Sequence, residues 1–203
     1  SGQSVSMNSA GDRVAIGAYL NDGTGTDAGH VRVYEYSSGS WSQLGSDIDG
    51  EAADDRSGQS VSMNSAGDRV AIGAYLNDGT GSNAGHVRVY EYSNSSWTQL
   101  GSDIDGEAAE DYSGRSVSMN SAGDRVAIGA PYNDDTGNYA GHVRVYEYSN
   151  SSWNQLGSDI DGEAVNDYSG FSVSMDSAGD RVAIGAYLND GTGTDAGHVR
   201  VYE

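Results

Sequence analysis

The sequence predicts an all-β protein built as a β-propeller, and two observations carry this prediction. The chain consists of four near-copies of one 56-residue repeat, which cover residues 1–56, 57–112, 113–168 and, shortened, 169–203. Every complete copy holds four short segments rich in β-branched and aromatic residues, separated by Gly, Asn, Asp and Ser. Four short strands per repeat are typical of a four-stranded antiparallel propeller blade. Residues 1–203 are therefore expected to form a single propeller segment of three full blades and a three-stranded fourth.

The first repeat shows why each strand is expected. Residues 4–7 alternate small polar and apolar side chains, and a turn-forming run, residues 8–12, follows. Residues 13–18 (RVAIGA) suit a strand buried on both faces, where Gly17 lets a neighbouring sheet approach closely. A Gly-rich loop then leads to a third strand at residues 30–36. The rest of the repeat supplies a turn at 37–40, an outermost strand at 41–48 and a crossover to the next blade at 49–56.

Charge and composition narrow the class of function. The chain carries 30 Asp and Glu against 10 Arg and no Lys, a formal charge of −20, so nucleic acid is not an expected partner. No apolar run approaches the roughly 20 residues that span a bilayer, so we expect no membrane insertion. Cysteine is absent, which rules out disulfides and thiolate metal sites. With neither a signal peptide nor an initiator Met in it, the sequence is expected to be a mature segment, and its acidity favours an extracellular or cell-surface setting.

Three motifs resemble those of the FG-GAP repeat family, known from integrin alpha subunits and from many secreted proteins. They are residues 169–173 (SGFSV), 129–131 (GAP) and 143–146 (VRVY), and their counterparts recur in all four copies. Three copies have Gly-Ala-Tyr in place of Gly-Ala-Pro. The resemblance implies a ring of about seven blades, so we expect this chain to be part of a larger ring or array, completed by another copy or by further sequence. The family's Asp-rich calcium loop is replaced here by Asn8–Asp12, and we expect no calcium at that turn.

The crossovers between blades are the better candidates for a calcium site. Each combines four carboxylates with a glycine that permits a sharp turn, and Ca²⁺ prefers six to eight oxygen ligands. Solvated acidic loops, and an Asp that accepts backbone hydrogen bonds ahead of Ser-Gly, are the alternative interpretation. The candidate ligands are Asp47, Asp49, Glu51, Asp55, Asp103, Asp105, Glu107, Asp111, Asp159, Asp161, Glu163 and Asp167.

Features that occur in every repeat are more often architectural than catalytic. The histidines at the start of the third strand (His30, His86, His142, His198) are therefore not expected to be general bases, and no enzyme activity is expected. The repeated arginines, such as Arg13 and Arg32, are expected to pair with Glu35, with Asp12 or with crossover carboxylates. The tryptophans (Trp41, Trp97, Trp153) suit either packing between blades or stacking on sugars.

Two classes of function follow. The first is a non-enzymatic extracellular structural or interaction module, an adhesion or surface-assembly propeller with a protein partner or self-association, stiffened by calcium. The alternative is a lectin-like, carbohydrate-binding propeller with one site per blade. Repeat-specific contacts are expected on one loop rim, formed by Asn133, Asp134, Asp135, Asn138 and Tyr139, because function concentrates on variable loops. Asn94 and Asn150 lie in N-glycosylation acceptor patterns, and a polar turn explains them equally well.

Overall fold

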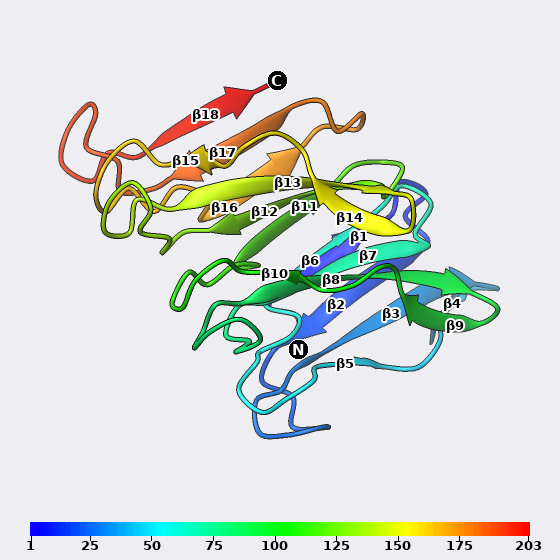
Figure 1. Ribbon diagram of the computed structural model, residues 1–203. Helices are drawn as coiled ribbons and strands as arrows, with labels where there is room; N and C mark the ends of the chain where they lie inside the picture. Colours follow the sequence, from blue (N-terminus) through cyan, green and yellow to red (C-terminus); the bar gives the residue numbers. More distant parts are fainter.

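The computed structural model describes residues 1–203 as four antiparallel sheets, one for each repeat (Figure 1). Blade 1 contains β1 (Val5–Met7), β2 (Arg13–Ala18), β3 (His30–Ser37), β4 (Ser40–Gln43) and β5 (Ile48–Asp49). Blade 2 contains β6 (Ser60–Met63), β7 (Arg69–Ala74), β8 (His86–Ser93), β9 (Ser96–Gln99) and β10 (Ile104–Asp105). Blade 3 contains β11 (Ser116–Met119), β12 (Arg125–Ala130), β13 (His142–Ser149), β14 (Ser152–Gln155) and β15 (Ile160–Asp161), and blade 4 contains β16 (Ser172–Met175), β17 (Val182–Ala186) and β18 (His198–Tyr202). The all-β prediction is confirmed, and no helix that could cross a membrane is present.

The first hairpin of each blade is locked by the residue that follows the first strand. The Asn8 side chain accepts hydrogen bonds from the backbone N–H groups of Asp12 and Arg13, at 3.1 and 2.9 Å, and donates one to the Asp12 carboxylate at 2.7 Å. Such local side-chain bonds replace the ladder bonds that a tight turn lacks. The absence of calcium at this turn stays a prediction.

The outermost strand departs from the prediction. Residues 41–48 were expected as one strand, but the structure has β4 along the second half of β3 and β5 opposite its first two residues. Gly45, between them, has a φ of +77°, a left-handed conformation that interrupts an extended strand. Each of the first three sheets therefore has five strands instead of four.

Consecutive blades pack face to face, and the same two faces meet each time. We call the face that carries Val31 and Val33 in blade 1 the leading face, and the face that carries Val61, Met63 and their neighbours in blade 2 the trailing face. All four of these side chains are buried in one core cluster between the blades, and Trp97 of blade 2 joins them. Equivalent clusters fill the spaces between blades 2 and 3 and between blades 3 and 4. The hydrophobic core is thus divided among the interfaces between blades.

Glycine sets the distance between neighbouring sheets. A Cβ added at Gly73 would overlap the carbonyl oxygen of Gly114 in the next blade, and Gly17 and Gly129 occupy the same position in their own blades. The close approach expected from the RVAIGA segments is confirmed. It lets the Ser60 hydroxyl donate to the Gly114 carbonyl at 2.7 Å.

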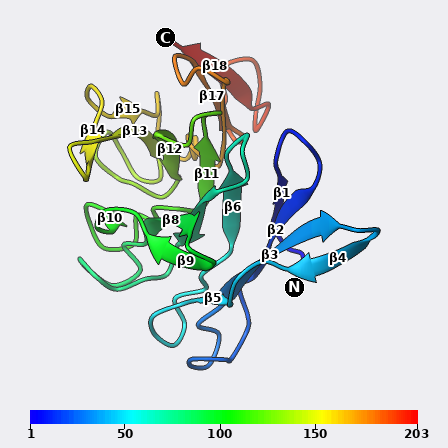
Figure 2. The same cartoon turned by 90° about the vertical axis from the view of Figure 1, so that its right-hand side faces the viewer.

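A line of hydrogen bonds runs from blade to blade along the innermost strands. The backbone N–H of Ser9 donates to the carbonyl of Ser65 at 3.2 Å, Ser65 donates to Ser121 at 3.1 Å, and Ser121 donates to Ser177 at 3.0 Å. In Figure 2, β1, β6 and β11 lie toward the middle, with β4 and β14 at the periphery. The four blades are therefore arranged like sectors around this inner line.

Candidate functional site

The first and last blades each leave one apolar face uncovered. On the trailing face of blade 1, Val5 is 63% exposed and Met7 is 54% exposed, whereas their equivalents in blade 2, Val61 and Met63, are buried. On the leading face of blade 4, Val199 is 67% exposed and Val201 is 66% exposed, in contrast to the fully buried valines of β3. The apolar residues of these two end faces match those that make the interfaces inside the molecule.

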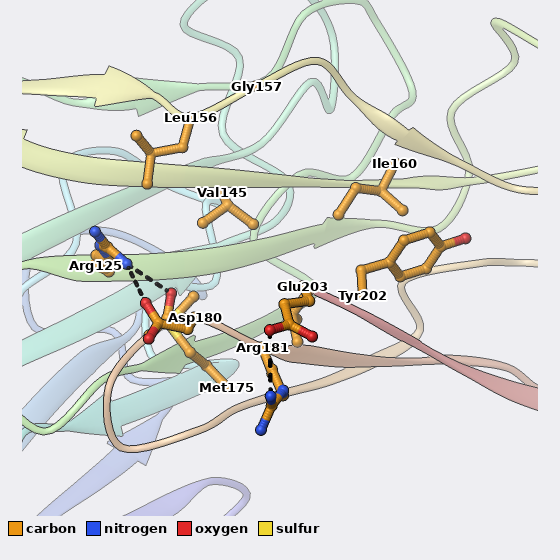
Figure 3. Close-up of a pocket in the computed structure, with 12 residues that line it drawn as sticks. Arg125, Val145, Leu156, Gly157, Ile160, Met175, Asp180, Arg181, Tyr202 and Glu203 are labelled. Atoms are coloured by element: carbon orange, nitrogen blue, oxygen red, sulfur yellow. Dashed lines mark hydrogen bonds and ion pairs between the residues drawn. The ribbon is translucent and has the colours of Figure 1, made fainter.

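An open cavity lies between blades 3 and 4 and has a volume of about 510 Å³ (Figure 3). Val145, Leu156 and Ile160 line its blade 3 side, and Met175 and Tyr202 line its blade 4 side. In the two preceding interfaces a tryptophan fills this place: the Trp97 ring packs on Gly45 and the Trp153 ring on Gly101, whereas nothing lies within 4 Å of a Cβ built at Gly157. The cavity therefore has the position of an indole ring.

Both buried tryptophans have structural roles. The indole N–H of Trp97 donates to the Leu44 carbonyl at 2.8 Å, and that of Trp153 donates to the Leu100 carbonyl at 2.8 Å. Trp97 and Trp153 are 8% and 9% exposed, which leaves little ring surface for a sugar, while Trp41 on the free trailing face is 46% exposed. Carbohydrate binding stays a prediction, and these two residues do not support it.

One carboxylate of each crossover holds the loop together. Asp55, Asp111 and Asp167 are 2–3% exposed. The Asp55 carboxylate accepts a hydrogen bond from the backbone N–H of Ala52 at 3.1 Å and another from the Asn77 side chain at 3.1 Å. Asp111 and Asp167 repeat both bonds in their own crossovers. This is the backbone-capping role considered as an alternative to calcium.

Most of the remaining crossover carboxylates face basic side chains. Asp47 accepts two hydrogen bonds from the Arg32 guanidinium, at 2.9 and 2.8 Å, which lowers the pKa of Asp47. Glu51 pairs with Arg88 of the next blade, and Arg13 pairs with Glu35 at 2.7 Å, so the arginine pairing predicted from the sequence is confirmed. Of the four carboxylates of this crossover, Asp47 and Asp49 lie together beside His30, whereas Glu51 and Asp55 bind other groups. Calcium among the four stays a prediction. Asp49, Asp103, Asp105 and Asp161 lie in or beside β5, β10 and β15, and Glu163 pairs with Arg200 at 3.3 Å.

Three groups of side chains do combine a histidine with carboxylates at short range. They are His30 with Asp47 and Asp49; His86 with Glu51 and Asp103; and His142 with Glu107, Asp135 and Asp159. In each group the potential ligand atoms lie within 4.8 Å of one another. The third group has one more carboxylate than the others.

The histidines of these groups are buried and their pKa values are lowered. Burial lowers the pKa of His30 and of His86. Burial, assisted by the Arg144 charge, lowers the pKa of His142 to about 4, so its ring is neutral at pH 7. Burial also raises the pKa of Glu107, and the nearby Asp159 and Asp135 charges add to that rise.

The rim residues predicted for partner contacts have mixed environments. Asn133 is buried and binds the Asp111 carboxylate at 3.2 Å, and the Asp134 carboxylate accepts the Tyr139 N–H at 2.7 Å. The Tyr139 ring stacks on Tyr168 at 5.6 Å, within a row of tyrosines. Asp135 and Asn138 are exposed. Only part of this rim is free to meet a partner, and partner binding there stays a prediction.

Asn94 and Asn150 occupy exposed two-residue hairpin turns between β8 and β9 and between β13 and β14. Asn94 has a φ of 51° and the following Ser95 a φ of 66°, as a type I′ turn requires. The turn explains the Asn-Ser sequence, and glycosylation of these accessible side chains stays a prediction.

Residues 47–90 match the FG-GAP repeat family. The matched segment runs from the crossover after blade 1 to β8, so the resemblance expected from the sequence is confirmed there. FG-GAP repeats typically occur in extracellular or surface proteins.

A solved structure is similar to this chain in fold. A crystal structure from Bacteroides fragilis, described as a 6-phosphogluconolactonase, shares 13% sequence identity with this chain at a TM-score of 0.52. The alignment covers 78% of this chain and 38% of that one, so the chain spans well under half the length of the neighbour. At this identity the likeness shows the fold, a β-propeller. The comparison with curated proteins found no match.

Sequence reasoning missed the histidine groups. It considered the crossover carboxylates and the histidines separately, because they lie far apart in each repeat. A signal was present in the repeat-specific Asp135, which replaces a glycine found at the same position of the other three copies.

Proposed function

We propose that this chain is a non-enzymatic extracellular interaction module that assembles head to tail, with the leading face of blade 4 docking on the trailing face of blade 1 of a second copy. The uncovered end faces carry this proposal. Contiguous exposed apolar surface is typical of interaction sites. An interface between two different patches of the same chain generates rings or open filaments, according to its rotation.

The choice of a second copy as the occupant rests on complementarity. In every internal interface a trailing face with the sequence of Val5 and Met7 covers a leading face with the sequence of Val199 and Val201. The chemistry that fits these surfaces is that of another repeat.

Polar groups on the end faces are placed to support this contact. Between blades 1 and 2, the Ser4 hydroxyl donates to the Gly58 carbonyl at 2.7 Å, and the Ser6 hydroxyl accepts the Met63 N–H at 2.9 Å. The fourth blade presents Ser172 and Ser174 in the corresponding positions. A docked copy would therefore find both apolar and hydrogen-bonding partners.

The decisive experiment mixes two variants that each damage one end face. Met7→Glu spoils the trailing face and Val201→Glu spoils the leading face, and neither wild-type side chain is buried. By light scattering, wild-type protein is expected to form species heavier than the 21.1 kDa monomer as concentration rises, and each variant alone is expected to stay monomeric. The mixture should form a dimer only, because one intact interface remains. Ser152→Glu, at an exposed position of β14 in blade 3 and away from both end faces, is the matched charge control.

Two results would contradict the proposal. Wild-type protein that stays at 21.1 kDa at every concentration would show that the end faces do not associate. Assembly of the wild type with no dimer in the mixture would show that the contact uses other surfaces. Thermal unfolding of the wild type with Ca²⁺ and with a chelator tests the predicted calcium stiffening separately, because an ion that binds the folded chain raises its Tm.

A further inference from the structure

The side chain of His142 is buried without a hydrogen-bond partner. Its side chain is 1% exposed, and neither ring nitrogen has a hydrogen-bond partner. Buried polar groups in native proteins almost always have one, because an unsatisfied group retains its full desolvation cost. The equivalent His30 and His86 do not have both nitrogens buried and unpaired.

Carboxylates surround this histidine on the side of Nδ1. Oε2 of Glu107 and Oδ2 of Asp159 each lie 3.9 Å from Nδ1, too far for a hydrogen bond. Asp135 completes a group whose four potential ligand atoms all lie within 4.8 Å of one another. The group draws on the crossover from blade 2 (Glu107), on the loop between β12 and β13 (Asp135), on the first residue of β13 (His142) and on the residue before β15 (Asp159).

Two features distinguish this group from its counterparts in blades 1 and 2. Gly23 and Gly79 occupy the position of Asp135 there, so those groups have one carboxylate fewer. Arginine also binds Asp47 and Asp103 in those blades, whereas Arg144 turns to the Asp105 carbonyl at 2.7 Å and to Glu107 at 3.4 Å. Asp159 is left without an arginine partner.

We propose that Glu107, Asp135, His142 and Asp159 bind one divalent transition-metal ion, with Zn²⁺ as the best-fitting class. One imidazole nitrogen and three carboxylate oxygens form a donor set that Zn²⁺ accepts, whereas Ca²⁺ takes oxygen ligands. Zn²⁺ bonds of about 2.0–2.1 Å place tetrahedral ligand atoms about 3.4 Å apart. The present separations are 3.9 Å from Nδ1 to two of the carboxylates and at most 4.8 Å within the group. They therefore need to contract, which a cation would drive by removing the repulsion among three carboxylates.

Neighbouring groups already support this arrangement. Gln155 donates to Oδ1 of Asp159 at 2.6 Å and leaves Oδ2 facing the histidine. Arg144 faces Oε1 of Glu107 and leaves Oε2 in the group. Three carboxylates and one arginine sum to a charge of −2, which a divalent ion cancels. Such outer partners orient the ligands of metal sites.

The test is a Zn²⁺ titration of the whole chain by calorimetry, with a competing chromophoric chelator for tight binding. Wild-type protein is expected to bind one Zn²⁺ per chain, and Asp135→Gly is expected to weaken that binding at least tenfold. This variant carries no risk to folding from the backbone, because the other three repeats have Gly at this position. Asp195→Gly is the control, since it removes one exposed carboxylate from the loop of the fourth repeat.

Thermal unfolding gives a second readout. Zn²⁺ is expected to raise the Tm of the wild type and of Asp195→Gly, and to raise that of Asp135→Gly much less. The proposal is overturned if the wild type shows no saturable Zn²⁺ binding. It is equally overturned if several equal sites fill together, if Asp135→Gly binds as tightly as the wild type, or if Ca²⁺ displaces Zn²⁺ at equal concentration.

Discussion

Trp97→Ala tests whether stability resides in the interfaces between blades, and the repeat supplies its own control. Trp97 is 8% exposed, lies in the cluster between blades 1 and 2, and donates to the Leu44 carbonyl at 2.8 Å. Trp41 has the same place in blade 1, but its ring is 46% exposed and packs mainly on Tyr36 at 5.4 Å. The two substitutions are chemically identical and differ only in whether a preceding blade covers the ring.

The expected costs differ severalfold. Removing a buried tryptophan costs about 3–5 kcal/mol, through lost burial and the cavity left behind. For Trp41→Ala we expect about 1 kcal/mol or less, because an exposed ring loses little beyond one aromatic contact. Trp97→Phe keeps most of the apolar surface and loses the hydrogen bond, so about 1 kcal/mol is expected.

The assay is urea unfolding followed by far-ultraviolet circular dichroism, in dilute protein so that self-association does not contribute. Circular dichroism is preferred because the substitutions remove fluorophores. Equal losses of unfolding free energy for Trp97→Ala and Trp41→Ala would refute the assignment of stability to the interfaces. So would a loss below about 1 kcal/mol for Trp97→Ala, since it lies well under the range for a buried aromatic residue.

Three further substitutions probe other contacts. Gly73→Ala should lower the unfolding free energy by about 1–3 kcal/mol, because its methyl group overlaps the backbone of the next blade. The control Gly185→Ala meets only a serine hydroxyl and should cost less. Equal losses of unfolding free energy in urea would contradict this reasoning. Arg88→Lys should lower the Tm, because lysine lacks the planar guanidinium that binds Glu51 and Asp103 at once. The same change at the exposed Arg181 should have almost no effect. An unchanged Tm for Arg88→Lys would count against a stabilising role of these two ion pairs. Asn64→Ala removes three hydrogen bonds from a hairpin and should cost about 1–3 kcal/mol in the same urea assay. An unchanged unfolding free energy would show that the hairpin does not depend on them.

Much of the fold could be predicted because the sequence pattern of each strand and turn occurs in several copies of the repeat. The segment RVAIGA forms a strand in the first three copies, with Arg13–Ala18 matching the expected bounds, and VAIGA forms the strand in the fourth. Gly17 permits the close approach that was expected. The prediction of one continuous outermost strand was wrong, because the break in this strand depends on the left-handed conformation of Gly45. The alternation of side chains around that glycine gives no sign of its dihedral angle.

The candidate sites depend on contacts between repeats, which periodicity within one repeat cannot supply. Glu107 lies in the crossover that follows blade 2, close to His142 at the start of β13 in blade 3. No spacing of residues within one repeat predicts that these two side chains lie together. Likewise, Val61 and Val5 have the same neighbours in sequence, but only Val61 has a blade in front of it. The difference between buried and exposed copies of one residue appears only when the order of the blades is known.

The line of hydrogen bonds through Ser9, Ser65, Ser121 and Ser177 has an evolutionary consequence. Each serine meets the serine of the next copy, 56 positions further along the chain, so every junction is made by the same pair of partners. Loss or duplication of a whole repeat by unequal recombination would join surfaces that already fit, without any compensating substitution. Changes in the number of blades would therefore preserve every interface between blades, and selection would act on the resulting size and curvature of the assembly.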